Sequence, residues 1–213
     1  MARGRAPAGA RSAVVERLVA AVTEPGCPIC RCLEIEARRD LAAYLREQTM
    51  DPAGRAALRR AGGFCAWHTS LLPEAADGIL SVALLVEDLL AAPAPPRAAC
   101  PACAALRTRL DEYLRALLEP AATARLGRGL GLPCRPHLRA LRARARRDPR
   151  LGALEAALGA RAARLRADVA GFIAKQDYRS AEAPTAEEAR AWSEGLAHLG
   201  GRLALFGSDL ARD

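Results

Sequence analysis

Apolar side chains recur at steps of three and four residues along most of this chain, which is the period of an amphipathic α-helix. The pattern is clear over residues 15–22, 33–45, 106–117 and 151–172. No segment alternates apolar and polar residues in the way that a half-buried β-strand does. The pattern therefore predicts an all-α fold.

Several helix boundaries can be placed from local signals. Asp51-Pro52 predicts a helix start, because the aspartate can cap free amides and proline needs no amide hydrogen at the first helical position. Thr185 and Glu188 have the spacing of a capping box and predict the start of the last helix. The segment 79–90 is apolar around its whole circumference, so we expect it to be buried or to form a homodimer.

The last third of the chain carries two long apolar seams. They consist of Leu151, Leu154, Leu158, Leu165, Val169 and Phe172, and of Trp192, Leu196, Leu199, Leu203 and Phe206. Steps of three and four within each seam are typical of helices that pack lengthwise. We expect an antiparallel helical hairpin over 148–207 that packs on the preceding helices.

An internal repeat precedes this hairpin. Cys27-Pro28-Ile29-Cys30 returns as Cys100-Pro101-Ala102-Cys103, and Tyr44-Leu45-Arg46 returns as Tyr113-Leu114-Arg115. The first pair of motifs is shifted by 73 residues and the second by 69. The difference of four residues is about one helical turn, so both copies keep the same face toward the core.

The repeat sets the expected domain organisation. We expect a disordered amino terminus over 1–11, where Arg, Ala, Gly and Pro follow no period. A first helical repeat (12–92) and a second (100–147) are expected on either side of a Pro-rich linker at 93–99.

Each copy also carries a Cys-x-x-His motif, one helical hairpin after its Cys-Pro-x-Cys motif. Cysteine and histidine in sets of four are typical ligands of a tetrahedral metal ion such as zinc. We expect one Cys3His site in each repeat, which closes a long loop between two helix starts. The first site would consist of Cys27, Cys30, Cys65 and His68, and the second of Cys100, Cys103, Cys134 and His137.

Other chemistry can use the same residues. Thiolate-rich ligation also suits an iron–sulfur cluster, although histidine is the less usual fourth ligand. Cys-Pro-x-Cys also resembles the redox dithiol of glutaredoxins and thioredoxins, but the βαβ context is missing and the motif occurs twice. Structural zinc is the interpretation we favour.

Three single residues and one charged segment were weighed separately. Cys32 has no counterpart in the second copy and is interpreted as a small core residue, with a spare ligand or sensor thiol as the alternative. His198 is interpreted as a packing or surface histidine, and Trp67 as a core residue and not a stacking platform. The arginine-rich segment 135–150 can contact phosphates of a nucleic acid, but no aromatic residues are interleaved, so a solvated helix face is favoured.

Composition narrows the class and the compartment. The chain of 213 residues is 51% hydrophobic but only 4% aromatic, so metal ligation is a plausible source of extra stability. The net charge of +8 is almost wholly arginine, which limits its value as a sign of an anionic partner. No segment has the pattern of a signal peptide or of a membrane span, and clustered cysteines outside a disulfide scaffold favour a cytoplasmic metal-binding protein without a membrane partner.

The complete set of motifs resembles a bacterial protein family without an established function. The resemblance rests on the tandem Cys-Pro-x-Cys motifs, on Gly63-Phe64-Cys65-x-x-His68, on Leu132-Pro133-Cys134-x-Pro136-His137-Leu138, on the stretch from Phe172 to Arg179 and on Trp192 in the last helix. It covers about 27–201 and implies a bacterial origin and a shared metal-site pattern, but no catalytic activity. From the residues themselves we expect a non-enzymatic interaction or regulatory module with an unidentified protein partner.

Overall fold

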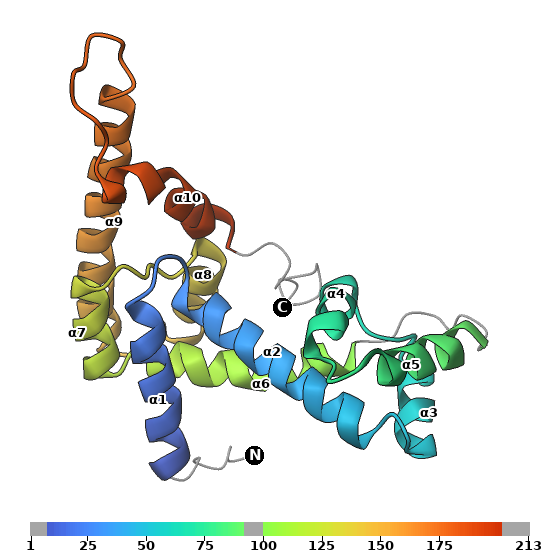
Figure 1. The fold of residues 1–213 in the computed structure, drawn as a ribbon. Coiled ribbons are helices and arrows are strands. Elements are labelled where there is room, and N and C mark those ends of the chain that lie inside the picture. Colours follow the sequence, from blue (N-terminus) through green and yellow to red (C-terminus); the bar gives the residue numbers. More distant parts are fainter. Residues whose placement is uncertain (1–7, 92–99, 202–213) are drawn as a thin grey trace. The chain divides into compact units, whose positions relative to one another are not determined.

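The computed structural model describes residues 8–91 and 100–201, with the side chains described from residue 13 onward, and is built from helices (Figure 1). The helices within these ranges are α1 (Ala8–Val22), α2 (Pro28–Glu47), α3 (Pro52–Arg60), α4 (Ala66–Ala75), α5 (Ile79–Ala91), α6 (Pro101–Ala116), α7 (Pro120–Arg128), α8 (Arg135–Arg144), α9 (Leu151–Ala174) and α10 (Ala186–Gly200). Extended pairing among the described residues is limited to one isolated bridge between Gly26 and Gly131. The all-α prediction is confirmed.

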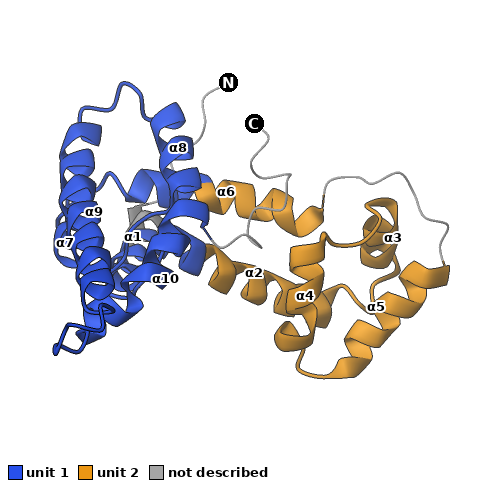
Figure 2. Ribbon diagram, turned by 90° about the horizontal axis from the view of Figure 1, so that it is seen from above, with its two compact units in different colours: residues 1–32, 111–202 blue, residues 33–110, 203–213 orange. Residues whose placement is uncertain are grey.

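The chain forms two compact units (Figure 2). Unit 1 consists of residues 1–32 and 111–202, and unit 2 of residues 33–110 and 203–213. Both α2 and α6 contribute their residues to the two units, because the boundaries fall inside these helices. The predicted linker at 93–99 lies outside the described residues, and α1 begins at Ala8, inside the segment that was predicted to be disordered.

Unit 1 has its core around α9. This helix packs against α7 and α10, while α7 also contacts α1 and α10 also contacts α8. Leu18 of α1, Leu126 of α7 and Leu154 of α9 are completely buried. The three residues belong to helices far apart in the sequence, so the apolar stripes of these helices form one common core.

Unit 2 packs α5 against α3 and α4. The predicted cap of α3 is present, since the carboxylate of Asp51 accepts hydrogen bonds from the amides of Ala53 and Gly54. Leu58 of α3 and Leu85 of α5 are buried in the core of this unit. The same core therefore fixes α3 and the apolar helix α5.

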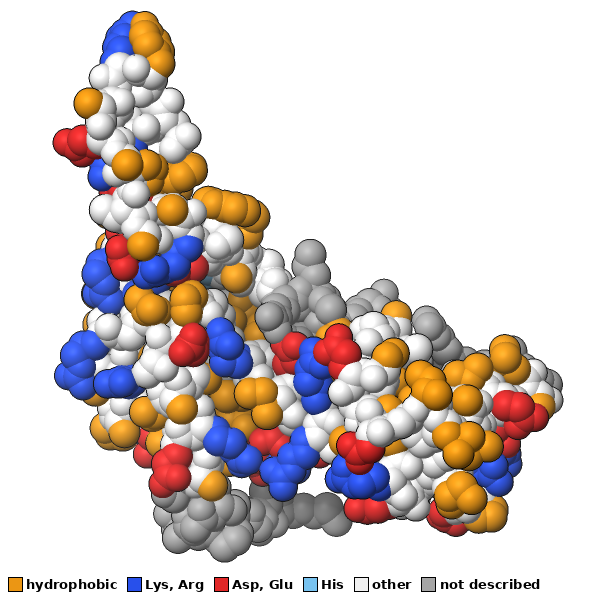
Figure 3. All heavy atoms as spheres, viewed as in Figure 1, with side chains coloured by type: hydrophobic (Ala, Val, Ile, Leu, Met, Phe, Trp, Pro, Cys, Tyr) orange, Lys and Arg blue, Asp and Glu red, His pale blue; other side chains and the backbone are white. Residues whose placement is uncertain are grey.

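Helix α5 exposes much of its apolar surface, and hydrophobic side chains gather over it on the face drawn in Figure 3. Its large exposed residues are Ile79, Leu80, Val86 and Leu90. Helix α5 is therefore buried within its own chain only along a narrow side around Leu85. A homodimer through 79–90 stays a prediction. Among the described helices, none combines the length and the apolar character needed to cross a bilayer.

Candidate metal centres

The eight predicted ligands occur as four pairs, and each pair sits at the beginning of a helix. Cys65 and Cys134 occupy the N-cap positions of α4 and α8, and Cys27 and Cys100 directly precede α2 and α6. The second ligand of each pair follows three residues later, which places it on the same side of the first turn. Neither N-cap sulfur of α4 or α8 caps its own helix through a side-chain hydrogen bond, so these thiols stay directed at other partners.

Each pair of ligands lies at a helix start because the backbone carbonyl of its first cysteine accepts the first hydrogen bond of the helix. The carbonyl groups of Cys27, Cys65, Cys100 and Cys134 each accept a hydrogen bond from the amide four residues later, at 2.9–3.2 Å. Pro28 and Pro101 take the first helical position, where no amide hydrogen is required. The free amides and the positive end of the helix dipole then favour the thiolate form of the sulfurs.

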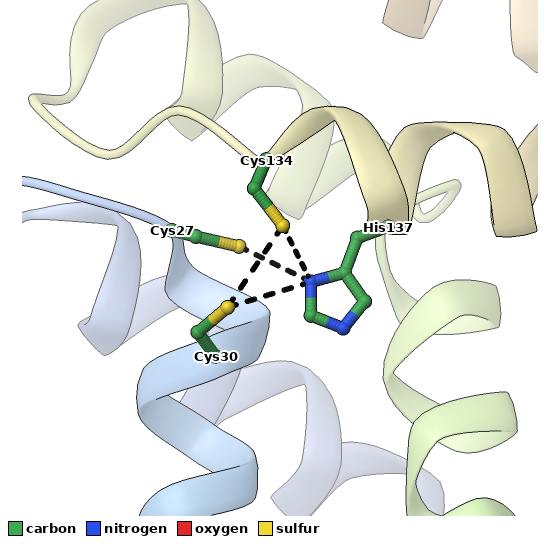
Figure 4. A group of neighbouring side chains, drawn as sticks. All are labelled: Cys27, Cys30, Cys134 and His137. Carbon is green, nitrogen blue, oxygen red and sulfur yellow. Dashed lines mark hydrogen bonds between the residues drawn. The ribbon is translucent and has the colours of Figure 1, made fainter. Parts of the chain in front are cut away.

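Four of the ligands meet in unit 1 and form cluster A, which consists of Cys27, Cys30, Cys134 and His137 (Figure 4). Nδ1 of His137 lies 3.4 Å from Sγ of Cys27, 3.7 Å from Sγ of Cys30 and 3.1 Å from Sγ of Cys134. The sulfurs of Cys30 and Cys134 are 3.9 Å apart. All four residues are buried, so the cluster is a compact group of soft donor atoms away from bulk water.

The other four ligands meet in unit 2 and form cluster B, which consists of Cys65, His68, Cys100 and Cys103. Nδ1 of His68 lies 3.2 Å from Sγ of Cys65, 3.6 Å from Sγ of Cys100 and 3.5 Å from Sγ of Cys103. The sulfurs of Cys65 and Cys103 are 3.7 Å apart. Cluster B therefore repeats the donor set and the spacing of cluster A.

The predicted composition of the two sites was wrong, although all eight residues lie in one cluster or the other. Each Cys-Pro-x-Cys motif joins the Cys-x-x-His motif of the other repeat, so Cys27 and Cys30 meet Cys134 and His137 instead of Cys65 and His68. The reason is the length of α2. Its 20 residues carry the chain away from Cys27, and at 1.5 Å per residue the helix is about 30 Å long.

Both clusters have the dimensions of a site for one ion. With bond lengths of about 2.3 Å to sulfur and 2.0–2.1 Å to nitrogen, a tetrahedral zinc ion places its sulfurs about 3.8 Å apart and each sulfur about 3.5 Å from the nitrogen. The sulfur–sulfur distances of 3.7 and 3.9 Å and the sulfur–nitrogen distances of 3.1–3.7 Å fall around these values. The ligand atoms of each cluster lie within 4.8 Å of one another, so both clusters are arranged to hold a metal ion.

The charge state of the metal-free clusters follows from burial and mutual hydrogen bonds. In cluster B, hydrogen bonds with Cys103 and Cys65 lower the pKa of Cys100, while those with Cys100 and Cys65 raise the pKa of Cys103. Burial alone would lower the pKa of His68, but hydrogen bonds to Cys100 and Cys65 raise it to about 9. The sulfurs of Cys100 and Cys103 therefore differ in proton affinity, although both lie next to the ring of His68.

Cluster A shows the same division between its sulfurs. Burial opposes ionisation of Cys27, but hydrogen bonds with Cys134, Cys30 and His137 hold its pKa well below the ordinary value. Hydrogen bonds with Cys134 and Cys27 raise the pKa of Cys30, and a hydrogen bond with Cys27 raises that of Cys134 to about 12. Neighbouring thiols share protons because several thiolates at this distance repel each other, and a dication removes that repulsion.

Backbone contacts hold the two halves of cluster A together. The amide of Gly131 donates to the carbonyl of Val22 at 2.9 Å, and the amide of Leu132 donates to the carbonyl of Gly26 at 2.9 Å. A Cβ at Gly131 would lie 3.1 Å from the backbone of Val22, which is tighter than ordinary contact, so glycine favours this close approach. The segments that lead into Cys27 and Cys134 are therefore fixed next to each other.

Side chains from α9 and α10 support the same segment, and sequence reasoning missed them. Arg161 donates twice to the carbonyl of Leu130, at 2.8 and 3.1 Å, and pairs with the buried carboxylate of Glu194 at 2.7 Å. The ring of His198 lies 2.9 Å from the carbonyl of Pro133. Burial lowers the pKa of His198, which favours the neutral ring as a hydrogen-bond donor. Arg161 lies three residues after Leu158 and four before Leu165, so it occupies a position of the apolar seam, and this polar residue within the seam is the signal that could have identified it.

The other residues that were considered from the sequence are engaged in packing or in ion pairs. Trp67 is buried, as predicted, and the centre of its ring lies 4.5 Å from that of the His68 ring. Cys32 is buried outside both clusters, with Sγ 3.9 Å from the carbonyl of Arg17. Several arginines of 135–150 are occupied by carboxylates, namely Arg142 by Glu155, Arg144 by Asp111 and Arg150 by Asp148 and Glu119.

Comparison with known proteins adds no family to this description. No family model, no curated protein and no solved structure matches the chain. The resemblance to a bacterial family stays a prediction from the motifs, and the functional argument rests on the two clusters.

Proposed function

We propose that each cluster binds one zinc ion as a structural site, and that the protein is a zinc-binding helical module without enzymatic activity. The observation that carries this proposal is the meeting of three sulfurs and one imidazole nitrogen in each cluster, at spacings that suit one tetrahedral ion. A zinc ion with four protein ligands has no open position for water or substrate, which is typical of structural sites. Each ion joins two helix starts that are far apart in the sequence, and this stabilises the folded chain.

The spacing of the donor atoms favours one ion over an iron–sulfur cluster. An iron–sulfur cluster distributes its terminal ligands over two or more irons, so ligands on different irons lie farther apart than ligands on one shared ion. Sulfurs at 3.7 and 3.9 Å suit the shared ion. The alternative of reactive Cys-Pro-x-Cys thiols is supported by the ligand atoms of each motif, which lie within 4.8 Å of one another, since neighbouring thiols can form a disulfide when an oxidant is present.

The role of the module is proposed from its surface. The four large apolar residues exposed on α5 offer a surface for a protein partner or a second copy of the chain. Nucleic-acid binding through 135–150 is less favoured, because Arg142, Arg144 and Arg150 already pair with carboxylates. A cytoplasmic location remains an expectation from cysteine usage.

The metal content tests the proposal directly. Protein purified without oxygen should contain two zinc ions per chain by elemental analysis and should show no visible absorption. Fewer than one ion per chain would refute structural zinc. A brown protein whose visible absorption is bleached by a reductant would instead support the iron–sulfur alternative.

A further inference from the structure

A small cavity lies directly against cluster A, within unit 1. It has a volume of about 190 Å³. The segment 25–31 lines one side and the inner face of α10 lines the other. The side chains that matter for its chemistry are Cys27, Cys30, Arg31, Ser193, Glu194 and Ala197.

The cavity reaches one side of cluster A only. Cys27 and Cys30 line it, whereas Cys134 and His137 do not. Gly201 lies close to the sulfur that the cavity does not reach, because a Cβ added there would lie 3.0 Å from Sγ of Cys134. A molecule in the cavity therefore meets the sulfurs of Cys27 and Cys30 first.

The charged groups at the wall are largely occupied. The carboxylate of Glu194 accepts from Arg161 at 2.7 Å and from Arg190 at 2.9 Å, so two guanidinium groups compensate its charge. Arg31 donates to the carbonyl of Pro25 at 3.0 Å. The two sulfurs are thus the groups in this cavity with lone pairs suited to soft metal ions and soft electrophiles.

We propose that this cavity is the entrance to cluster A, through which small thiols and other small soft reagents reach Cys27 and Cys30. This inference rests on the proposed metal site. With an ion held by cluster A, Cys27 or Cys30 would be the ligand that an incoming thiol replaces, and the proton of that thiol would pass to the released cysteine. The step needs no oxidant or reductant, because it is a ligand substitution.

The size of the cavity limits what can enter. Pockets for drug-sized ligands and cofactors measure about 300–1,000 Å³, which is more than this cavity offers. The compounds admitted are therefore small thiols, small electrophiles or one arm of a chelating molecule. A protein surface or a large cofactor cannot reach the sulfurs by this route.

Pulse alkylation of the zinc-loaded full chain with N-ethylmaleimide tests the entrance. Cys27 and Cys30 share the tryptic peptide 18–31, while Cys134 lies on the peptide 129–139, so mass spectrometry follows the two sides of cluster A separately. The occluding variant is Ala197→Leu, which adds three carbon atoms at the cavity wall. Ala189→Leu is the matched control, because Ala189 is exposed on the same helix and does not line the cavity.

We expect the peptide with Cys27 and Cys30 to react before the peptide with Cys134. Ala197→Leu should slow its alkylation about tenfold, while Ala189→Leu should leave the rate unchanged. Unchanged rates in Ala197→Leu, or earlier reaction of Cys134, would overturn the inference. Circular dichroism checks the fold, and Ser193→Met serves as a second occluding variant should Ala197→Leu fail to fold.

The zinc count, measured before alkylation, separates the two proposals. If the chain contains two zinc ions and Ala197→Leu has no effect on alkylation, the proposed function is retained and the proposed entrance is refuted. If the chain contains no zinc, the proposed function is refuted, and the ligand-exchange step is refuted with it.

Discussion

Replacing Arg161 by methionine removes the polar contact that connects α9 to the segment before Cys134. The Arg161 side chain is 5% exposed and that of Glu194 is 8% exposed, so their ion pair is shielded from water. The guanidinium also donates twice to the carbonyl of Leu130. Methionine keeps much of the side-chain length but offers no donor to either group.

The expected cost follows from what is left behind. Removing one partner of a buried ion pair destabilises a protein by about 3–5 kcal/mol, because the other charge stays buried without compensation. Glu194 keeps its second partner, Arg190, which reduces this cost. The carbonyl of Leu130 loses two donors in a part-buried position, where water can replace them in part, so this loss adds about 1 kcal/mol. We expect a net loss of about 3 kcal/mol in the free energy of unfolding.

Urea unfolding of the zinc-loaded protein, followed by circular dichroism, measures this loss. Arg164→Met is the matched control, because Arg164 lies on the same helix and donates to the carbonyl of Gly127 at 2.7 Å, but in an exposed position. We expect the control to cost less than about 1 kcal/mol. A cost of Arg161→Met that equals the cost of the control would refute the role assigned to the buried pair.

Three further predictions concern the geometry of cluster A, the core of unit 1 and the pH dependence of zinc binding at cluster B. Gly201 has φ of +71°, and a carbon added there would crowd the sulfur of Cys134. Gly201→Ala should therefore cost about 1–3 kcal/mol in stability and weaken zinc binding at cluster A. Competition with a chelator measures the binding, and unchanged zinc affinity would contradict this prediction. Leu126→Ala should lower the free energy of unfolding by about 2–5 kcal/mol, because Leu126 is fully buried, and a loss under about 1 kcal/mol in urea titration would contradict its burial. Zinc binds the neutral ring of His68, and the pKa of this ring is raised to about 9. The zinc affinity of cluster B should therefore rise with pH up to about 9 and fall on acidification. Zinc titrations between pH 6 and 9 that give the same affinity throughout would refute this.

The sequence predicted the helix starts and the ligand residues well. Asp51 and Thr185 cap α3 and α10, and the capping box with Glu188 is present as predicted. These signals are local, because they depend on the backbone geometry of one helical turn. The ligand residues were found for the same reason, since each pair occupies one turn.

The grouping of the ligands could not be found from local signals. Pairing Cys27 with Cys65 assumes that the chain returns to its starting point after one hairpin, but α2 continues for 20 residues without a break. Its expected length, about 30 Å, already argues against a return within the next short helix. The crossed grouping is a property of helix length and not of motif spacing.

The described part of the seam predicted on the last helix is exposed, and Leu203 and Phe206 of that seam lie outside the described residues. Trp192, Leu196 and Leu199 are exposed, whereas Ala191 and Glu194 face the interior. The apolar pattern pointed to the wrong side because Glu194 is buried as the partner of Arg161. Periodicity assumes that polar residues face water, and a buried ion pair breaks this assumption.

The central claim is that two ions are bound and that each is shared between the two repeats. It is tested by counting zinc in two double variants, each of which replaces two cysteines by serine. The variant with Cys27→Ser and Cys134→Ser alters cluster A alone and should retain one zinc ion per chain. The variant with Cys27→Ser and Cys65→Ser alters both clusters and should retain none. The reverse result, with one ion left in the second variant and none in the first, would contradict the crossed grouping.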